Sequence, residues 1–435
     1  MIKKLFPILS FLIGIVAVTS CADDPDLMIP TENESLSSRT NPLIEKAQQA
    51  YEMCYGSSSR SATAFYAHDI VPVTSLKSRA AAPDTVIYIV NEAEGNGFVA
   101  LTGGDRPEIL AVSDNGTINN LEDIDNPGLK MFFDNATAYA AQKVEINKTF
   151  EPVTPFPLFK EEVLYEMQYC KPRCETRWNQ EYPEGLFCPN NFCGCTITAT
   201  TQTLSYFQVP DTINLTNPDA DKAYVNLNWA SMVSNVVSLS WYQYNPNSAR
   251  TPLQIEREYN LGRISRELGY RMKAVYGTDG TAASLDNMAK VVRQLCPTLK
   301  VEGRYYGAPI ASKVLGDGII IMQGDQWYSV QDSINNNHKK CYCHAWVVDG
   351  YDNNITYHKI YVYNSSTGKY EYSESESYTE EDNLQHINWG WGGKCNGFFK
   401  VNVFNTGSAI NPDTNSNPSY YNFNHRFSYF RISPK

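Results

Sequence analysis

The chain has 435 residues, of which 42% are hydrophobic and 19% charged, so it can bury a large core and is not a disordered protein. Its 36 basic residues stand against 47 acidic ones, which gives a net charge of -11 at pH 7. An acidic chain without a basic tract lacks the positive surface that binds phosphate backbones, so nucleic acid is excluded as an expected partner.

The N-terminus predicts export. Two lysines precede an apolar run from Leu5 to Val18, which is too short to span a bilayer comfortably and has the basic flank of a signal peptide. The residues that follow end at Cys21 and resemble a bacterial lipobox, in which the cysteine is diacylated. We expect a lipoprotein signal peptide at 1–20 and a lipid on Cys21 as the chain's only membrane contact. An ordinary secretory signal is the alternative.

A linker and a small α+β domain are predicted next. Residues 21–40 are polar and contain proline, as flexible linkers do. The predicted elements that follow are a helix at 41–53, strands at 85–90 and 98–101, and a helix at 126–144. A proline-rich segment at 152–157 then marks a boundary. We therefore expect a domain at 41–150, a linker at 151–170 and a large domain at 171–435.

One cysteine of the large domain has the setting of a nucleophile. Gly194-Cys195 precedes a segment without Gly or Pro that ends before Pro210, so a helix beginning at Cys195 is expected, although its threonines make it intrinsically weak. A helix N-terminus lowers the pKa of a thiol, and the thiolate is the reactive form. Gln180, upstream, can offer a side-chain N–H to an oxyanion. A buried or disulfide-bonded structural role is the alternative.

A histidine and an asparagine follow in the order Cys, His, Asn of papain-type proteases. His344 begins an alternating apolar run that ends at Tyr351, which predicts the start of a strand that enters a core. Asn388 can hydrogen-bond the imidazole and fix its tautomer, while Trp389 shields that bond from water. His386, close by, is expected to be a structural hydrogen-bonding residue rather than a second base.

These segments resemble the signature blocks of the streptopain family, papain-like bacterial cysteine proteases with an inhibitory propeptide. The matching blocks are Trp178-Asn179-Gln180, Gly194-Cys195, the run from His344 to Tyr351, and Asn388-Trp389-Gly390-Trp391-Gly392-Gly393. The resemblance covers about residues 165–435, and the stretch 98–115 is similar to the propeptide. It implies an α+β fold, in which a papain-like protease with a helical part and an antiparallel β part follows a small α+β pro-domain.

The resemblance also implies a function and roles for residues. It implies an exported cysteine endopeptidase that is made as a zymogen and hydrolyses peptide bonds through a thioester acyl-enzyme, with no cofactor or metal. Cys195 matches the nucleophile and His344 the base. Gln180 matches the oxyanion donor, and Asn388 and Trp389 match the residues that orient and cover the histidine. The residues expected at the substrate cleft are Gly280, Thr281, Ala282 and Cys343, the last of which replaces the family's usual glycine.

The expected partners are protein or peptide substrates and the chain's own pro-domain in cis, in a monomer. The expected location is the bacterial outer membrane or cell surface, through the lipid. A cut between about residues 148 and 175 is expected to activate the enzyme and to separate the mature fragment from its anchor. The alternative function is a catalytically inactive relative that binds peptides or proteases at the surface. Inactive relatives typically lose the cysteine or the histidine, and this chain keeps both Cys195 and His344.

The other cysteines leave three possibilities open. The chain has 11 cysteines, and in an oxidising compartment up to four disulfides are possible, which is the expectation we favour. Free thiols are the second possibility. The third is a structural zinc site, for which four cysteines have suitable spacing: Cys170, Cys174, Cys188 and Cys193.

Overall fold

The computed structural model describes residues 41–56, 65–74, 85–104, 107–149, 159–278, 280–331, 337–404 and 426–435. The predicted signal peptide, the predicted lipidation site Cys21, the first predicted linker and the proline-rich join at 150–158 lie outside these residues. Asn41–Lys435 form one compact unit. Within the described ranges, no helix has the length and apolar character needed to cross a membrane.

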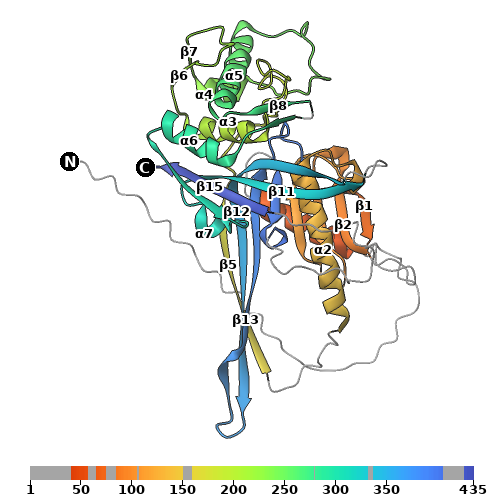
Figure 1. Cartoon of the computed structure of the whole chain (residues 1–435). Helices are drawn as coiled ribbons and strands as arrows, with labels where there is room; N and C mark the ends of the chain where they lie inside the picture. Colours follow the sequence, from red (N-terminus) through yellow and green to blue (C-terminus); the bar gives the residue numbers. More distant parts are fainter. Residues whose placement is uncertain are drawn as a thin grey trace, which may run out of the picture. The chain divides into compact units, whose positions relative to one another are not determined.

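One antiparallel sheet of 11 strands runs through this unit (Figure 1). Its order is β1-β2-β3-β4-β14-β13-β12-β11-β15-β10, and β5 pairs with β12. The strands are β1 (Ala67–Thr74), β2 (Thr85–Glu92), β3 (Phe98–Thr102), β4 (Ile109–Ser113), β5 (Phe159–Cys170), β10 (Leu299–Tyr306), β11 (Ile319–Gln331), β12 (Asn337–Asn364), β13 (Lys369–Asn388), β14 (Gly397–Lys400) and β15 (Arg426–Pro434). Because β4 pairs with β14, the N-terminal part (residues 41–149) and the C-terminal part (residues 159–435) share one sheet.

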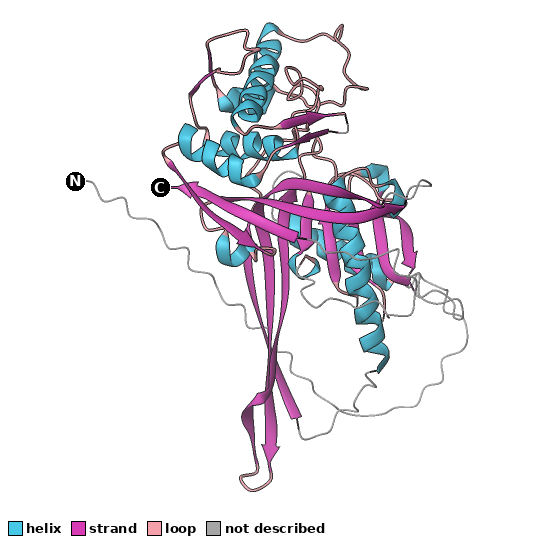
Figure 2. Ribbon diagram, in the orientation of Figure 1, coloured by secondary structure: helices cyan, strands magenta, loops and turns pink. Residues whose placement is uncertain are grey.

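The chain also has seven described α-helices. The helices are α1 (Pro42–Tyr55), α2 (Pro127–Thr149), α3 (Cys195–Phe207), α4 (Trp229–Asn235), α5 (Pro252–Arg271), α6 (Leu285–Leu295) and α7 (Ala311–Val314), with short 3-10 turns at Ala93–Gly95, Leu121–Asp123 and Val401–Val403. Four of those in the C-terminal part, α3 to α6, lie side by side in one group (Figure 1 and Figure 2). Two small sheets pair β6 (Thr212–Asn214) with β7 (Tyr224–Asn226) and β8 (Val275–Gly277) with β9 (Gly280–Ala282).

The side chains of β12 alternate between two hydrophobic cores. Ala345 and Val347 pack into the core that includes α3, whereas Trp346 and Val348 pack into the core that includes α2. Successive side chains of a strand point to opposite faces of the sheet. The strand that carries His344 therefore lies between a helix of the C-terminal part and a helix of the N-terminal part.

The α+β class is confirmed, as are the helices expected at 41–53, 126–144 and after Gly194 and the strands expected at 85–90 and 98–101. The predicted start of the strand at His344 is wrong. That strand, β12, begins at Asn337, and residues 337–348 pair continuously with β11. The alternating apolar run begins partway along β12, so its first residue does not mark the start of the strand.

Candidate active site

Cys195 is the first residue of α3, and Gly194 shapes the backbone that leads into it. Gly194 has a φ of 98°, in the left-handed region that favours glycine. A β-carbon at this position would lie 2.7 Å from the carbonyl oxygen of Thr281. The helix is buried on all sides over residues 196–205, so tertiary packing outweighs the weak helix preference of its threonines.

The thiol of Cys195 lies against the strand that carries His344. Burial raises the pKa of this thiol above its ordinary value, and hydrogen bonds from the backbone of Ala345 and Thr196 oppose the rise only in part. Ala345 is the residue after His344. The structure therefore places the thiol of the predicted nucleophile at the backbone next to the predicted base, in a setting that favours the neutral thiol.

His344 is buried, and its tautomer can be assigned. Its Nε2 lies 2.9 Å from the main-chain carbonyl oxygen of Trp389, which can only accept, so Nε2 carries the proton and Nδ1 is the basic nitrogen. The ring of Trp391 stands edge-on at a centroid distance of 5.7 Å. Burial lowers the pKa of His344 to about 4, so this imidazole is neutral at physiological pH.

The hydrogen bond that the sequence led us to expect between Asn388 and His344 is replaced by this contact with the Trp389 carbonyl. The Asn388 amide instead donates to the carbonyl of Thr176 at 2.8 Å and accepts from the N–H of Gly390 at 3.1 Å. Asn388 thus fixes the loop that presents the carbonyl, and its effect on the imidazole is indirect. Trp389 is fully buried, as expected of a residue that excludes water.

Gln180 and strand β9 lie close to Cys195 through main-chain and threonine contacts. The carbonyl of Gln180 accepts from the N–H of Cys193 at 2.9 Å, which holds the half-buried glutamine next to the segment that leads into α3. Thr281 donates to the carbonyl of Phe192 at 2.6 Å and touches Gly194. The structure thus places β9, which comprises Gly280, Thr281 and Ala282, against the segment that leads into the nucleophile, with Thr281 as the contacting residue.

Cys343 is the fourth residue expected at the substrate cleft. It precedes His344 on β12, so its exposed side chain points to the opposite face of the strand from the imidazole. Cys343 is disulfide-bonded. The structure therefore places it beside the histidine in sequence but not on the same side of the strand.

The expectation that most of the cysteines form disulfides is wrong. Cysteines 54, 170, 174, 188, 193, 195, 296 and 395 are free. Most of them are buried in different parts of the cores, where a free thiol packs as a small apolar group. For the alternative zinc site, the described ranges hold no group of three or more His, Cys, Asp or Glu that could bind a metal ion.

Gly128, the second residue of α2, contacts the predicted catalytic histidine, and sequence reasoning missed it. Asn126 caps the helix by accepting from the N–H groups of Gly128 and Leu129 at 2.9 and 3.1 Å. A β-carbon at Gly128 would lie 2.7 Å from Cδ2 of His344 and 2.6 Å from the ring of Trp389. The motif Asn126-Pro127 predicts a helix start, but nothing in the sequence indicates what that helix end touches.

A buried ion pair also joins the two parts of the chain. The ammonium of Lys400, on β14, is 3.2 Å from the carboxylate of Glu108 and 2.6 Å from that of Asp382, and Lys400 is 3% exposed. Burial alone would raise the pKa of Glu108, but Lys400, together with hydrogen bonds from Lys143 and Tyr139, holds it at about 2. Glu108 therefore remains charged and paired at all ordinary pH values.

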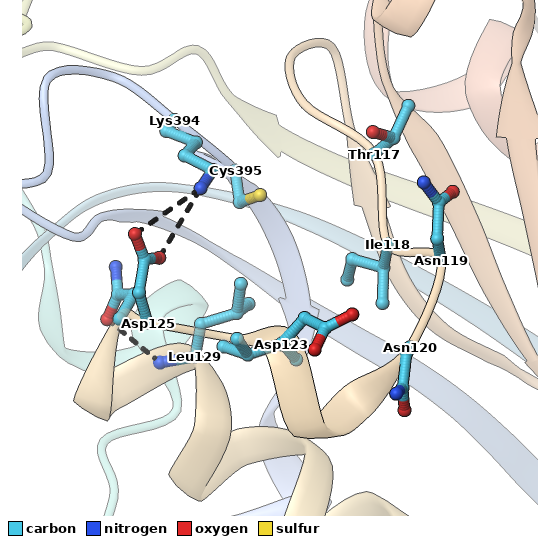
Figure 3. A pocket seen from close by; sticks show the side chains of 11 residues that line it. Thr117, Ile118, Asn119, Asn120, Asp123, Asp125, Leu129, Lys394 and Cys395 are labelled. Carbon is cyan, nitrogen blue, oxygen red and sulfur yellow. Dashed lines mark hydrogen bonds and ion pairs between the residues drawn. The ribbon is translucent and has the colours of Figure 1, made fainter.

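A small cavity lies between the loop that precedes α2 and the loop after the block Asn388–Gly393. It holds about 120 Å³, and its lining includes Thr117, Asn119, Asp123 and Cys395 (Figure 3). Lys394 crosses the boundary to pair with Asp125 at 3.4 Å, an exposed pair worth at most about 1 kcal/mol. This cavity adjoins the contact between the two parts and contains none of the predicted catalytic residues.

Comparison with known families identifies the C-terminal part. A sequence model described as the Peptidase C10 family matches residues 174–399, slightly more than half of the chain. The matched region contains Gln180, Cys195, His344 and Asn388. No curated protein matches the chain.

Proposed function

Because the chain belongs to the peptidase C10 family, the streptopain family of cysteine-type peptidases, we propose that Cys195 is its nucleophile and that the uncut chain is a zymogen. The observation that carries the second part is the contact of α2 with His344. The substrates are proteins or peptides, as for any peptidase.

The proposed chemistry uses Cys195, whose thiol lies at the backbone of Ala345, and His344, the residue before Ala345. The thiolate of Cys195 attacks the carbonyl carbon of the peptide bond, and the backbone N–H of Cys195 with the amide of Gln180 stabilises the oxyanion. His344 gives its proton to the leaving amine, which leaves a thioester. Water then attacks the thioester while His344 takes the water's proton, and the acid product and the thiolate are released.

The contact with α2 supports the zymogen because it opposes the charged form of the histidine. Gly128 covers the imidazole and takes part in burying it, and the positive end of the α2 dipole lies at the same place. Both effects disfavour an imidazolium. The active pair of a papain-type enzyme is a thiolate beside an imidazolium, so the uncut chain holds both partners in their inactive protonation states.

We infer that the activating cut falls at 150–158, between α2 and β5. Residues Phe159–Cys170 pair along their whole length with β12, and a paired strand cannot enter a protease cleft as an extended single segment. The sequence of this join contains Pro152, Pro155 and Pro157, and segments that connect folded parts are where proteolysis concentrates. Strand β5 would then become the N-terminus of the mature enzyme.

The N-terminal part would remain bound after this cut. Its strand β4 pairs with β14, the ring of Phe132 packs 4.9 Å from that of Phe399, and Glu108 pairs with the buried Lys400. Separation would expose these apolar surfaces and leave Lys400 with one partner fewer, which is costly. If Cys21 carries a lipid at the outer membrane or cell surface, the cut enzyme stays at that surface until the N-terminal part is degraded.

Replacing Gly128 with alanine tests the zymogen contact. The added methyl group overlaps the rings of His344 and Trp389, whereas alanine suits the helix itself, so the start of α2 must move off the histidine. We expect the uncut variant to react with iodoacetamide at Cys195 at least about ten times faster than the uncut wild type, since the raised pKa of the wild-type thiol keeps it un-ionised. The rate is read by mass spectrometry on chains that remain full-length.

The matched control is Lys130→Ala, a change on the same helix away from the histidine contact, which should leave the labelling rate unchanged. Wild-type and Gly128→Ala enzymes should be equally active once the N-terminal part has been removed. An unchanged labelling rate in a folded, uncut Gly128→Ala chain would refute the inhibitory contact.

A further inference from the structure

A carboxyl group is fully buried behind the start of α3. Glu184 is 0% exposed, and its carboxylate accepts hydrogen bonds from the hydroxyls of Thr198, at 2.6 Å, and Thr201. The thiol of Cys193 lies 3.5 Å from the same carboxylate. Neither the family blocks nor the proposed chemistry uses this group.

The partners of Glu184 belong to the segments that carry the reacting groups. Thr198 and Thr201 lie on the first two turns of α3, directly after Cys195. Cys193 leads into Cys195, and its N–H is bonded to the carbonyl of Gln180. A single side chain therefore connects the helix of the nucleophile with the segment of the oxyanion donor.

Burial without a cationic partner is energetically unfavourable for a carboxyl group, so a role for Glu184 beyond packing is worth examining. The groups that face it are the hydroxyls of Thr198 and Thr201 and the thiol of Cys193, with Cys188 close by, and no lysine or arginine in the described part of the chain forms an ion pair with it. Burial raises the pKa of Glu184 to about 7. A buried acid without a cation costs stability that an apolar side chain would not cost.

We propose that Glu184 is a positioning residue for the reaction, which sets the place of the Cys195 thiol relative to the amide of Gln180. The carboxylate offers an acceptor oxygen to each threonine. An amide offers only one acceptor and adds two donors that need partners of their own. The proposal rests on the proposed function, since it assumes that Cys195 and Gln180 act together on a substrate.

A positioning role makes a prediction that a purely structural role does not. Glu184→Gln should lower kcat on a short peptide by about 10- to 100-fold, the scale of a misplacement of up to an ångström, while KM changes less than about twofold. The wild-type kcat should also show an inflection near pH 7 that Glu184→Gln lacks, because only the carboxyl group titrates.

The matched control is Glu267→Gln. Glu267 is also 0% exposed and also accepts from a threonine hydroxyl, that of Thr216 at 2.6 Å. Its other hydrogen bonds come from the backbone of Thr216, from Asn217 and from Arg271, which lie outside the segments of Cys195 and Gln180. This variant should keep the wild-type kcat and pH profile. Should Glu184→Gln fail to fold, Thr201→Val removes one of the two donors with little change of shape and should lower kcat in the same way.

The experiments distinguish a failure of the proposed function from a failure of the positioning role alone. Wild-type hydrolysis that does not depend on Cys195 would overturn the proposed function and the positioning role with it. Hydrolysis that depends on Cys195, combined with an unchanged kcat and pH profile in folded Glu184→Gln and Thr201→Val, would overturn the positioning role alone.

Discussion

Replacement of Cys195 by alanine should abolish peptide hydrolysis and leave the chain at full length if processing is autocatalytic. No other side chain of the site can form the thioester, because the neighbouring Cys193 is fully buried and held against Glu184 and Thr198. The fold should persist, since the change removes one sulfur atom from a partly exposed position. Hydrolysis of a fluorogenic peptide and gel mobility of the expressed chain measure the two effects.

The control for this variant is Cys296→Ala, which removes a free and buried thiol far along the chain. It should keep full activity. An active-site thiol probe should modify Cys195 in the cut wild type, and fragment-ion spectra distinguish Cys195 from Cys193. Labelling at Cys193, or no labelling of a correctly cut enzyme, would favour the other reading of the chain as an inactive, peptide-binding relative.

Replacement of His344 by alanine should lower kcat by about 10²- to 10⁴-fold, the usual contribution of a general acid–base group. Asn388→Ala should be milder, about tenfold, because Asn388 acts through the loop that presents the Trp389 carbonyl rather than on the imidazole itself. Steady-state kinetics on the cut enzyme compares the two. Equal losses in both variants, with the structure unchanged, would contradict this ranking.

The elements of the fold could be predicted where local sequence determines them. Asn41-Pro42 and Asn126-Pro127 begin helices as expected, and the strands on either side of Gly95–Gly97 lie where the strand-like composition of 85–90 and 98–101 predicts them. The joining of both parts into one sheet could not be predicted, since the pairing of β4 with β14 connects residues almost 300 positions apart. The sequence of a strand carries little local signal of a partner so distant in the chain.

The candidate site also has residues that the sequence predicts and contacts that it does not predict. Cys195, His344, Gln180 and Asn388 could be found because their segments have recognisable motifs. The bond from His344 to a main-chain carbonyl, the approach of Gly128 and the role proposed for Glu184 depend on packing between distant segments, and no motif records them. The disulfide expectation failed for a related reason, because cysteine counts show how many thiols are present but not which of them meet.

The central claim is that α2 keeps Cys195 and His344 neutral until the chain is cut. The measurement that tests it most directly is the rate at which iodoacetamide alkylates Cys195 from pH 4 to pH 10, in the uncut chain and in the cut enzyme freed of its N-terminal part. In the uncut chain the pKa of the thiol is raised and that of His344 is about 4. Its rate should therefore stay low through neutral pH and rise only in the alkaline range.

The cut enzyme should instead react at a nearly constant rate from about pH 5 to pH 8, because a thiolate paired with an imidazolium forms with a thiol pKa of about 3–4. Two distinct profiles of this kind are the predicted result. An uncut chain that shows the acid-shifted plateau of the cut enzyme would contradict the account, since its thiolate would already be formed while α2 still contacts His344.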